Sequence, residues 1–284
     1  MNDYIRHLFP YLNTDRLKTW SCGHIMPQDN LIVWPVAKAR GGIDFDFTYD
    51  KRTSPTMIDA LGHCLSDLCA SIPDGVVVFF PSYRYMDEVI HWWKRDNSAG
   101  TGTLWSLVAK QKPIFQEFKD NAGGEDSFHG YSSSIEEGKG GLLLSVIGGK
   151  MSEGINFSDQ LGRGVVVVGL PFPNIQSAQW KAKLAYIEKT TVDRRGSRDD
   201  GKMAARDFYE NACMRAVNQS IGRAIRHEKD YASIVLLDRR YRTPRIQSKL
   251  PSWIRQGLVL GNGEESWTSV TGSLADFFRG KGVC

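Results

Sequence analysis

Five short apolar runs, rich in β-branched residues, constrain the fold of this chain more than any other feature. They are apolar throughout rather than alternating, and they span residues 31–36, 76–80, 142–147, 165–170 and 233–237. Such runs are typical of strands that are covered on both faces in a parallel sheet. Helical patterns separate them, at residues 54–71, 85–95, 177–190 and 203–226. This alternation predicts an α/β fold, a doubly wound parallel sheet with helices on both faces.

The composition is that of a folded protein without a membrane span or a secretion signal. Of the 284 residues, 41% are hydrophobic and 24% are charged, which excludes a disordered or low-complexity chain. The longest apolar stretches are far shorter than the roughly 18 residues that a membrane span requires, and the first residues lack the pattern of a signal peptide. The net charge of +4 leaves open whether a partner is a polyanion, because a local basic face would be diluted in the average.

The cysteines and histidines form no recognisable scaffold or metal motif. The five cysteines are scattered without a CxxC pair, and the six histidines form no HExxH motif. We therefore expect no disulfide framework and no metal site, with the thiols in a reducing compartment.

The chain is expected to form one large domain, residues 26–255, between an N-terminal extension, 1–25, and a C-terminal extension, 256–284. Ligands of doubly wound sheets bind at the carboxyl ends of the strands. The loops of interest are therefore residues 81–84, 148–158 and 171–175. Other loops are expected at residues 97–103 and 121–126, and the charged segment 193–202 is expected to be a solvated, mobile insertion.

One segment near residue 220 carries two arginines at helical spacing. Gln219, Gly222, Arg223 and Arg226 fall at offsets 0, 3, 4 and 7, so a helix places all four on one face. The apolar side of that helix would be formed by Val217, Ile221, Ala224 and Ile225. Two guanidinium groups beside an amide and a glycine suit a phosphate ligand. An ordinary amphipathic helix with a solvated basic face fits the same pattern.

Two strand ends carry polar groups that suit nucleic acid. The glycine-rich turn at residues 148–154 holds Lys150 and Ser152 and can cradle phosphate, although a plain tight turn explains this segment better when it is taken alone. It is not a Walker A loop, because no Gly-Lys pair in the chain is followed by Ser or Thr. After the strand at 76–80 come Ser82, Tyr83 and Arg84, which suit a phosphate backbone and a stacked base. Ser82 also suits a helix N-cap, and both roles can hold.

The segment Asp87-Glu88-Val89-Ile90-His91 looks like a DExH box. It lies inside a predicted helix rather than at a strand end, where a carboxylate could reach Mg²⁺. We therefore reject it as a nucleotide motif.

Taken together, these segments resemble the second RecA-like motor domain of superfamily 2 helicases of the XPD-like iron–sulfur group. Residues 79–83 look like motif IV, residues 149–159 like motif V and residues 219–227 like motif VI. Asn156 stands where many members carry Asp. With Lys150-Met151 and the segments 169–175 and 22–25, this is similar to the chromosome-loss (ChlR-type) helicases of sister-chromatid cohesion. The resemblance implies a RecA-like fold.

The resemblance implies an ATP-dependent 5′-to-3′ DNA helicase that acts in the nucleus, in cohesion and DNA repair. It would bind single-stranded and forked DNA and interact with replisome and cohesin factors, and it would not bind a membrane. In this family ATP and Mg²⁺ lie between two motor domains. The first domain supplies the Walker motifs and a four-cysteine 4Fe–4S insertion, and neither occurs in this sequence. We therefore expect the chain to be a piece of a longer helicase, without its N-terminal half, and inactive alone.

The resemblance also assigns roles to single residues. Arg226 would be the arginine finger, Arg223 a second phosphate contact and Gln219 the group that positions the attacking water or phosphate. Binding of nucleotide, and its coupling to DNA, would fall to Gly222, Glu153, Gly154 and Asn156. The DNA backbone would be held by Ser82, Tyr83, Arg84, Lys150 and Ser152.

Two other functions remain to be weighed. A non-catalytic RecA-like module that binds DNA or protein would keep the fold, but it has no need of Gln219, Arg223 and Arg226 at this spacing. A hydrolase with Ser152 as nucleophile lacks a plausible histidine base and an orienting acid.

Overall fold

A computed structural model describes Arg16, Lys18 and residues 27–95, 102–119, 124–223, 225, 227–260 and 266–282. The chain divides into two compact units. The larger comprises Ile25–Pro171 and Ala216–Cys284, and the smaller comprises Met1–His24 and Phe172–Arg215. The larger unit contains all three segments that resemble helicase motifs.

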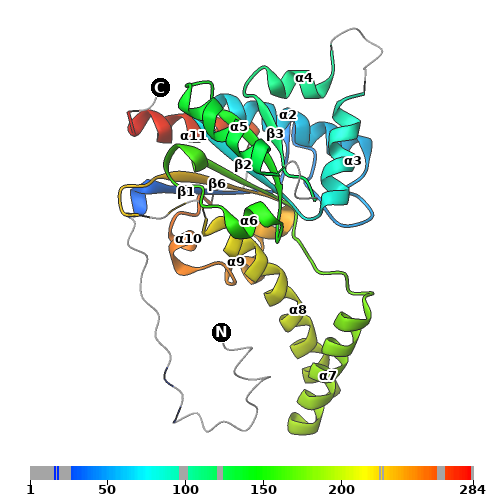
Figure 1. The fold of residues 1–284 in the computed structure, drawn as a ribbon. Coiled ribbons are helices and arrows are strands. Elements are labelled where there is room, and N and C mark those ends of the chain that lie inside the picture. Colours follow the sequence, from blue (N-terminus) through cyan, green and yellow to red (C-terminus); the bar gives the residue numbers. More distant parts are fainter. Residues whose placement is uncertain are drawn as a thin grey trace. The chain divides into compact units, whose positions relative to one another are not determined.

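A six-stranded parallel sheet forms the centre of the larger unit (Figure 1). Its order is β1-β6-β5-β2-β4-β3. The strands are β1 (Leu31–Val36), β2 (Gly75–Phe80), β3 (Ile114–Gln116), β4 (Gly141–Val146), β5 (Gly164–Val168) and β6 (Ala232–Leu237). The five predicted strands are confirmed to within two residues at each end, and so is the α/β fold class. The edge strand β3 was missed because it is only three residues long and half-buried throughout.

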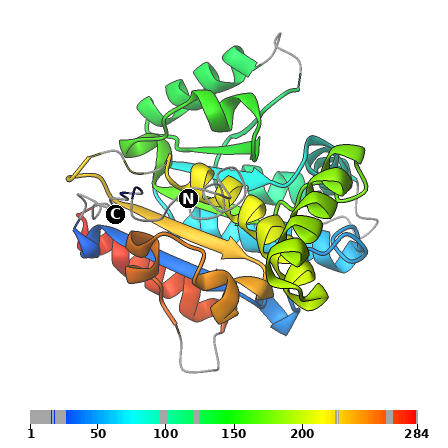
Figure 2. The same ribbon diagram turned by 90° about the horizontal axis from the view of Figure 1, so that it is seen from below.

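Four helices cover one face of this sheet: α2 (Pro55–Ser71), α3 (Tyr83–Trp93), α4 (Leu104–Ala109) and α11 (Trp267–Gly280). Figure 2 shows α11 beside β1. It buries Trp267, Val270, Leu274 and Phe278, and the Trp267 indole donates to Asp67 on α2 at 2.7 Å. The packing of the larger unit therefore continues beyond residue 255, where the sequence predicts the end of the domain.

The other face of the sheet carries α5 (Gly124–Glu136) and the ring of Phe157. The centroid of this ring lies 6.1 Å from that of Phe79 and 6.4 Å from that of Phe128. The prediction of a loop at 121–126 is wrong for residues 124–126, the part that the structure describes, because these residues form the first turn of α5. Glu125 and Asp126 favour the start of a helix, where the dipole is positive. Residues 97–101 of the other predicted loop lie outside the described residues.

The other elements that lie wholly in the larger unit are short. They are α6 (Lys150–Gly154), α9 (Pro244–Gln247), α10 (Ser252–Gln256) and the 3₁₀ turns Gln28–Asn30, Arg40–Gly42, Asp159–Gly162 and Arg239–Arg242. No helix in the described part of the chain is both long and apolar enough to span a membrane.

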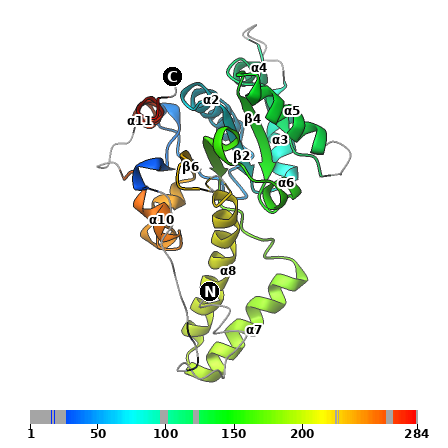
Figure 3. The same ribbon diagram turned by 60° about the vertical axis from the view of Figure 1, so that its left-hand side comes forward.

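The smaller unit contains α7 (Ala178–Arg195) and the first part of α8 (Arg198–Ile221), which lie side by side (Figure 3). The prediction that residues 193–202 form a mobile insertion is therefore wrong, because all but two of them belong to these helices. Gly196 ends α7 in the left-handed conformation with φ of 72°, and its N–H donates to Val192 at 2.7 Å. The Ser197 hydroxyl then accepts from the Asp200 N–H at the start of α8. The charges of this segment lie on the turn of a helical hairpin.

Candidate nucleotide and DNA site

Motif IV lies where β2 ends and α3 begins. The Ser82 hydroxyl caps α3 by accepting from the Tyr85 N–H at 3.3 Å. The half-buried Tyr83 donates its hydroxyl to Glu117 Oε1 at 2.6 Å. Arg84 is exposed and pairs with Glu88 at 2.9 Å, one turn along the helix. Of the three predicted DNA contacts, Arg84 is thus the one that solvent reaches most freely. Asp87 to His91 lie inside α3, as the rejection of a DExH box requires.

Motif V begins where β4 ends, with Gly148 at a φ of 72° and a short helix, α6, after it. Lys150, Gly154 and Asn156 are exposed. Ser152 is 4% exposed, and its hydroxyl donates to the Gly149 carbonyl at 2.8 Å. In this conformation the Ser152 hydroxyl stabilises the turn from inside. The side chain of Glu153 lies outside the described residues.

A buried carboxylate that the sequence did not reveal joins motif IV to motif V. Glu117 follows β3 and is 1% exposed. Its Oε1 accepts from the Tyr83 hydroxyl and from the Met151 N–H at 3.1 Å. Its Oε2 accepts from the Ser145 hydroxyl at 2.6 Å and from the Val146 N–H at 3.0 Å. Burial, and then the hydrogen bond to Glu117, raise the pKa of Tyr83 well above its usual value, so the phenol stays protonated.

Motif VI differs from the single helix face that the sequence predicts. Helix α8 ends at Ile221, so Gln219 lies exposed in its last turn while Gly222 and Arg223 lie in the turn that follows. Glycine is a poor helix former, and the Gly222 N–H makes the last hydrogen bond, to Asn218, at 3.0 Å. The expectation that one helix aligns all four residues is therefore wrong. Arg226, the predicted finger, lies outside the described residues.

The apolar side of motif VI is as predicted where it is described. Val217, Ile221 and Ile225 are all buried, at 0–3% exposed. Ala224, the fourth residue of this set, lies outside the described residues. Burial of this side leaves the half-buried Arg223 and the exposed Gln219 among the described polar groups of motif VI that a ligand can reach.

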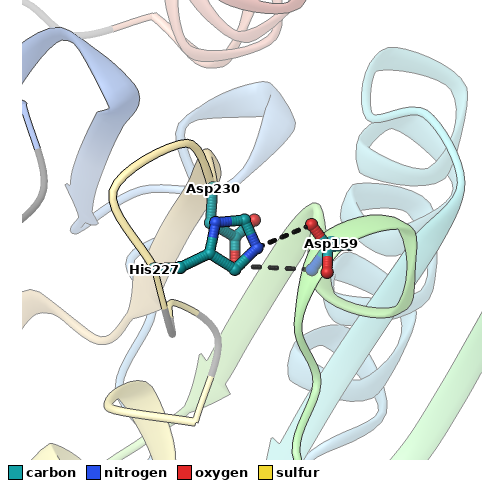
Figure 4. Close-up of side chains that lie close together, drawn as sticks. All are labelled: Asp159, His227 and Asp230. Carbon is teal, nitrogen blue, oxygen red and sulfur yellow. Dashed lines mark hydrogen bonds and ion pairs between the residues drawn. The ribbon is translucent and has the colours of Figure 1, made fainter.

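The end of motif V is tied to motif VI. The Phe157 N–H donates to the Arg223 carbonyl at 3.2 Å. Asp159 Oδ1 lies 2.9 Å from His227 Nε2, and the Asp159 N–H donates to Asp230 at 3.4 Å (Figure 4). These contacts join the two motifs on the side of the sheet where β5 and β6 begin.

Asp159, His227 and Asp230 also place three possible metal-ligand atoms within 4.8 Å of one another. However, the buried Asp230 carboxylate already accepts from Arg163 at 2.9 Å and from the Tyr231 N–H at 2.9 Å. A cation would compete with the Arg163 guanidinium for Asp230 Oδ1, and Asp230 Oδ2 already accepts from the Asp159 N–H. The group is therefore explained as an ion-pair cluster that holds motifs V and VI together.

Comparison with known proteins identifies the family. The model of the family described as "Helicase C-terminal domain" matches residues 65–257, which is more than half of the chain. The chain belongs to this family. The match includes all three motif segments, and its start lies inside α2.

Curated relatives narrow the assignment to the ChlR type. The protein named ATP-dependent DNA helicase chl1 of Aspergillus niger is 52% identical over 99% of this chain and 33% of its own length. The protein of that name from Coccidioides immitis is 51% identical over 91% of this chain and 31% of its own length. The chain thus spans about a third of the length of these relatives. The resemblance to an XPD-like helicase domain of the ChlR type is confirmed.

A solved structure confirms the fold. The one called XPD_APO covers 77% of this chain and 37% of its own, with a TM-score of 0.53 and 24% sequence identity. At that identity the likeness concerns the RecA-like fold alone.

Proposed function

We propose that this chain is the second motor domain of an ATP-dependent DNA helicase that moves 5′-to-3′ on single-stranded DNA. The observation that carries the proposal is the continuous connection between the three motifs. Motif IV is joined to motif V through Glu117, and motif V to motif VI through Phe157 and Asp159. A motor needs such a connection, because a change at the nucleotide must move the groups that hold DNA.

In this proposal, ATP and Mg²⁺ bind between this domain and an upstream motor domain. This domain contributes Gln219, Arg223 and Arg226, with Arg226 as the finger that stabilises charge on the transferred phosphoryl group. The upstream part supplies the Walker motifs and the 4Fe–4S cluster. The Asn156 amide, unlike the Asp of many XPD-like members, would bring no charge to the nucleotide site.

The exposure of each side chain indicates which residues can contact DNA. Arg84 and Lys150 are exposed cations next to the strand ends, so they can neutralise backbone phosphates without a change of fold. Tyr83 and Ser152 both use their hydroxyls within the protein. We propose that these two residues shape the grip, and that Arg84 and Lys150 hold the strand. We further propose, from the resemblance to ChlR-type helicases, a nuclear role in cohesion and DNA repair, at forked DNA with replisome and cohesin factors.

The test compares this chain alone with the same chain joined to the upstream part of the Aspergillus niger relative. We expect no ATPase activity from the chain alone, and DNA-stimulated ATPase activity from the fusion, with unwinding of forks that carry a 5′ tail. In the fusion, Arg226→Ala should lower the DNA-stimulated rate by about 10³-fold or more. Arg279→Ala, a matched change at an exposed arginine on α11, should leave it unchanged.

A fusion that binds DNA but never hydrolyses ATP would favour the alternative, a non-catalytic RecA-like module that binds DNA or protein. Full ATPase activity in the Arg226→Ala variant would show that the finger is another residue.

A further inference from the structure

The four groups that Glu117 accepts from come from separate parts of the chain. Tyr83 follows β2, Ser145 and Val146 end β4, and Met151 lies in α6. All four lie near the carboxyl ends of neighbouring parallel strands. A carboxylate that is almost fully buried is costly unless its oxygens are hydrogen-bonded, and here each oxygen accepts from two donors.

The space around this carboxylate is tightly filled. A Cβ atom at Gly149 would lie 2.5 Å from Glu117 Oε1 and 2.7 Å from the Tyr83 hydroxyl. Gly149 has an ordinary φ of −78°, so glycine is required at this position for space and not for backbone conformation. The turn of motif V is thus packed directly on the Glu117–Tyr83 pair.

Two residues held by Glu117 are each adjacent in sequence to an exposed cation. Tyr83 precedes Arg84, and Met151 follows Lys150. A shared acceptor for the Tyr83 hydroxyl and the Met151 N–H therefore fixes the two backbones that carry these cations. The Met151 N–H belongs to the glycine-rich turn, and Glu117 already accepts from it. This N–H is therefore not needed as a donor to a DNA phosphate.

We infer that Glu117 is a positioning residue for DNA binding: it fixes motif IV against motif V, so that Arg84 and Lys150 contact the phosphates of one strand together. This inference rests on the proposed function and assigns a role to a residue outside the three motifs. Glu117 does not contact DNA itself. Its negative charge would repel a phosphate, and it is shielded from solvent.

The experiment measures binding of fluorescein-labelled (dT)₂₀ to this chain by anisotropy, over a series of salt concentrations. Glu117→Gln keeps the size of the side chain, but its amide nitrogen cannot accept, so two of the four donors lose their acceptor. We expect the Kd to rise about tenfold, because one of the two cations no longer contacts the strand. We also expect the salt slope to fall by about 0.7, which corresponds to the loss of one phosphate contact.

The matched control is Glu137→Gln, which removes the same charge from an exposed residue paired with Lys139. Simple electrostatics predicts that either loss of a negative charge strengthens binding to a polyanion. Weaker binding in Glu117→Gln alone therefore supports positioning. Unchanged or tighter binding in a folded Glu117→Gln variant overturns the inference.

A second variant keeps the inference testable if Glu117→Gln does not fold. Tyr83→Phe removes one donor and leaves the other three hydrogen bonds of Glu117 in place. We expect a rise in Kd and a lower salt slope here too, and binding equal to wild type overturns the inference. A wild-type chain that does not bind (dT)₂₀ overturns the proposed DNA grip and this inference with it. A binding wild type with unaffected variants overturns this inference alone.

Discussion

The two connections of motif V differ in how they are made. Towards motif IV, the connection is the carboxylate of Glu117 with its four donors, 1% exposed; we call it the IV–V junction. The connection to motif VI consists of the exposed pair Asp159–His227 and the buried pair Asp230–Arg163; we call it the V–VI junction. The first uses neutral donors around one carboxylate, and the second is built on the Asp230–Arg163 ion pair.

The two junctions also lie at opposite edges of the sheet. Because β4 and β5 are parallel, the chain between them must return from the carboxyl edge to the amino edge. The IV–V junction lies at the first edge, close to the proposed DNA contacts, and the V–VI junction lies at the second, before β5 and β6. The buried IV–V junction can hold a fixed spacing there, whereas the exposed Asp159–His227 pair contributes little to holding the V–VI junction.

Loss of the buried anchor of the V–VI junction should have the largest effect on stability. Asp230→Ala removes the carboxylate that lies 2.9 Å from the Arg163 guanidinium, whose side chain is 7% exposed, and leaves it only the more distant Asp74 at 3.9 Å. We expect the free energy of unfolding to fall by about 3–5 kcal/mol, as for other buried pairs that lose one partner. Urea denaturation followed by circular dichroism measures this. The control is Asp276→Ala, at an exposed ion pair on α11, which should change stability by less than about 0.5 kcal/mol.

The next effect comes from crowding the IV–V junction. Gly149→Ala places a methyl group against the Glu117 carboxylate and the Tyr83 hydroxyl. Overpacking of this kind should cost about 1–3 kcal/mol of unfolding free energy. Gly154→Ala, in the same short helix, has no heavy atom within 4 Å of the new methyl group and serves as the control. Equal stability of the two variants would show that the junction is less tightly packed than the structure indicates.

The sequence predicts what depends on local pattern. Unbroken apolar runs identified five of the six strands, and the capping residues Ser54 and Ser177 lie at the predicted helix starts, with Ser82 three residues before one. The exception is β3, whose three residues are too few for a pattern. Its place in the sheet comes from pairing with β4.

The candidate site was less predictable because its connections are not local. Glu117 is one of 32 acidic residues, and its partners lie 28 to 34 positions away in sequence, so only the register of β3 and β4 brings them together. Helical spacing at Gln219 to Arg226 predicted one face, but the helix ends at Ile221 before that face is complete. The role of Arg226 stays a prediction.

Alkaline pH should weaken the IV–V junction specifically. The pKa of Tyr83 is raised from its usual value of 10.0 by burial and then by Glu117. The hydrogen-bonded phenol therefore contributes its full stability below pH 10, and this contribution is lost as the pH rises above 10 towards the folded-state pKa. The measurement is the difference in unfolding free energy between wild type and Tyr83→Phe, at pH 8 and at pH 11. It should shrink at pH 11, while the effects of Tyr85 and Tyr131 cancel in the subtraction.

The smallest effect is expected at the exposed part of the V–VI junction. Asp159→Asn removes a pair whose side chains are both about half exposed, and such pairs contribute about 0–1 kcal/mol. Asp159 also has a φ of 56°, which Asn tolerates and Ala does not, so Asp159→Ala should cost about 1–2 kcal/mol more. In 1 M NaCl the extra loss in Asp159→Ala should remain, because salt screens charge but not backbone strain. A loss in Asp159→Asn as large as that in Asp230→Ala would place the anchor of this junction at the surface rather than at the buried pair.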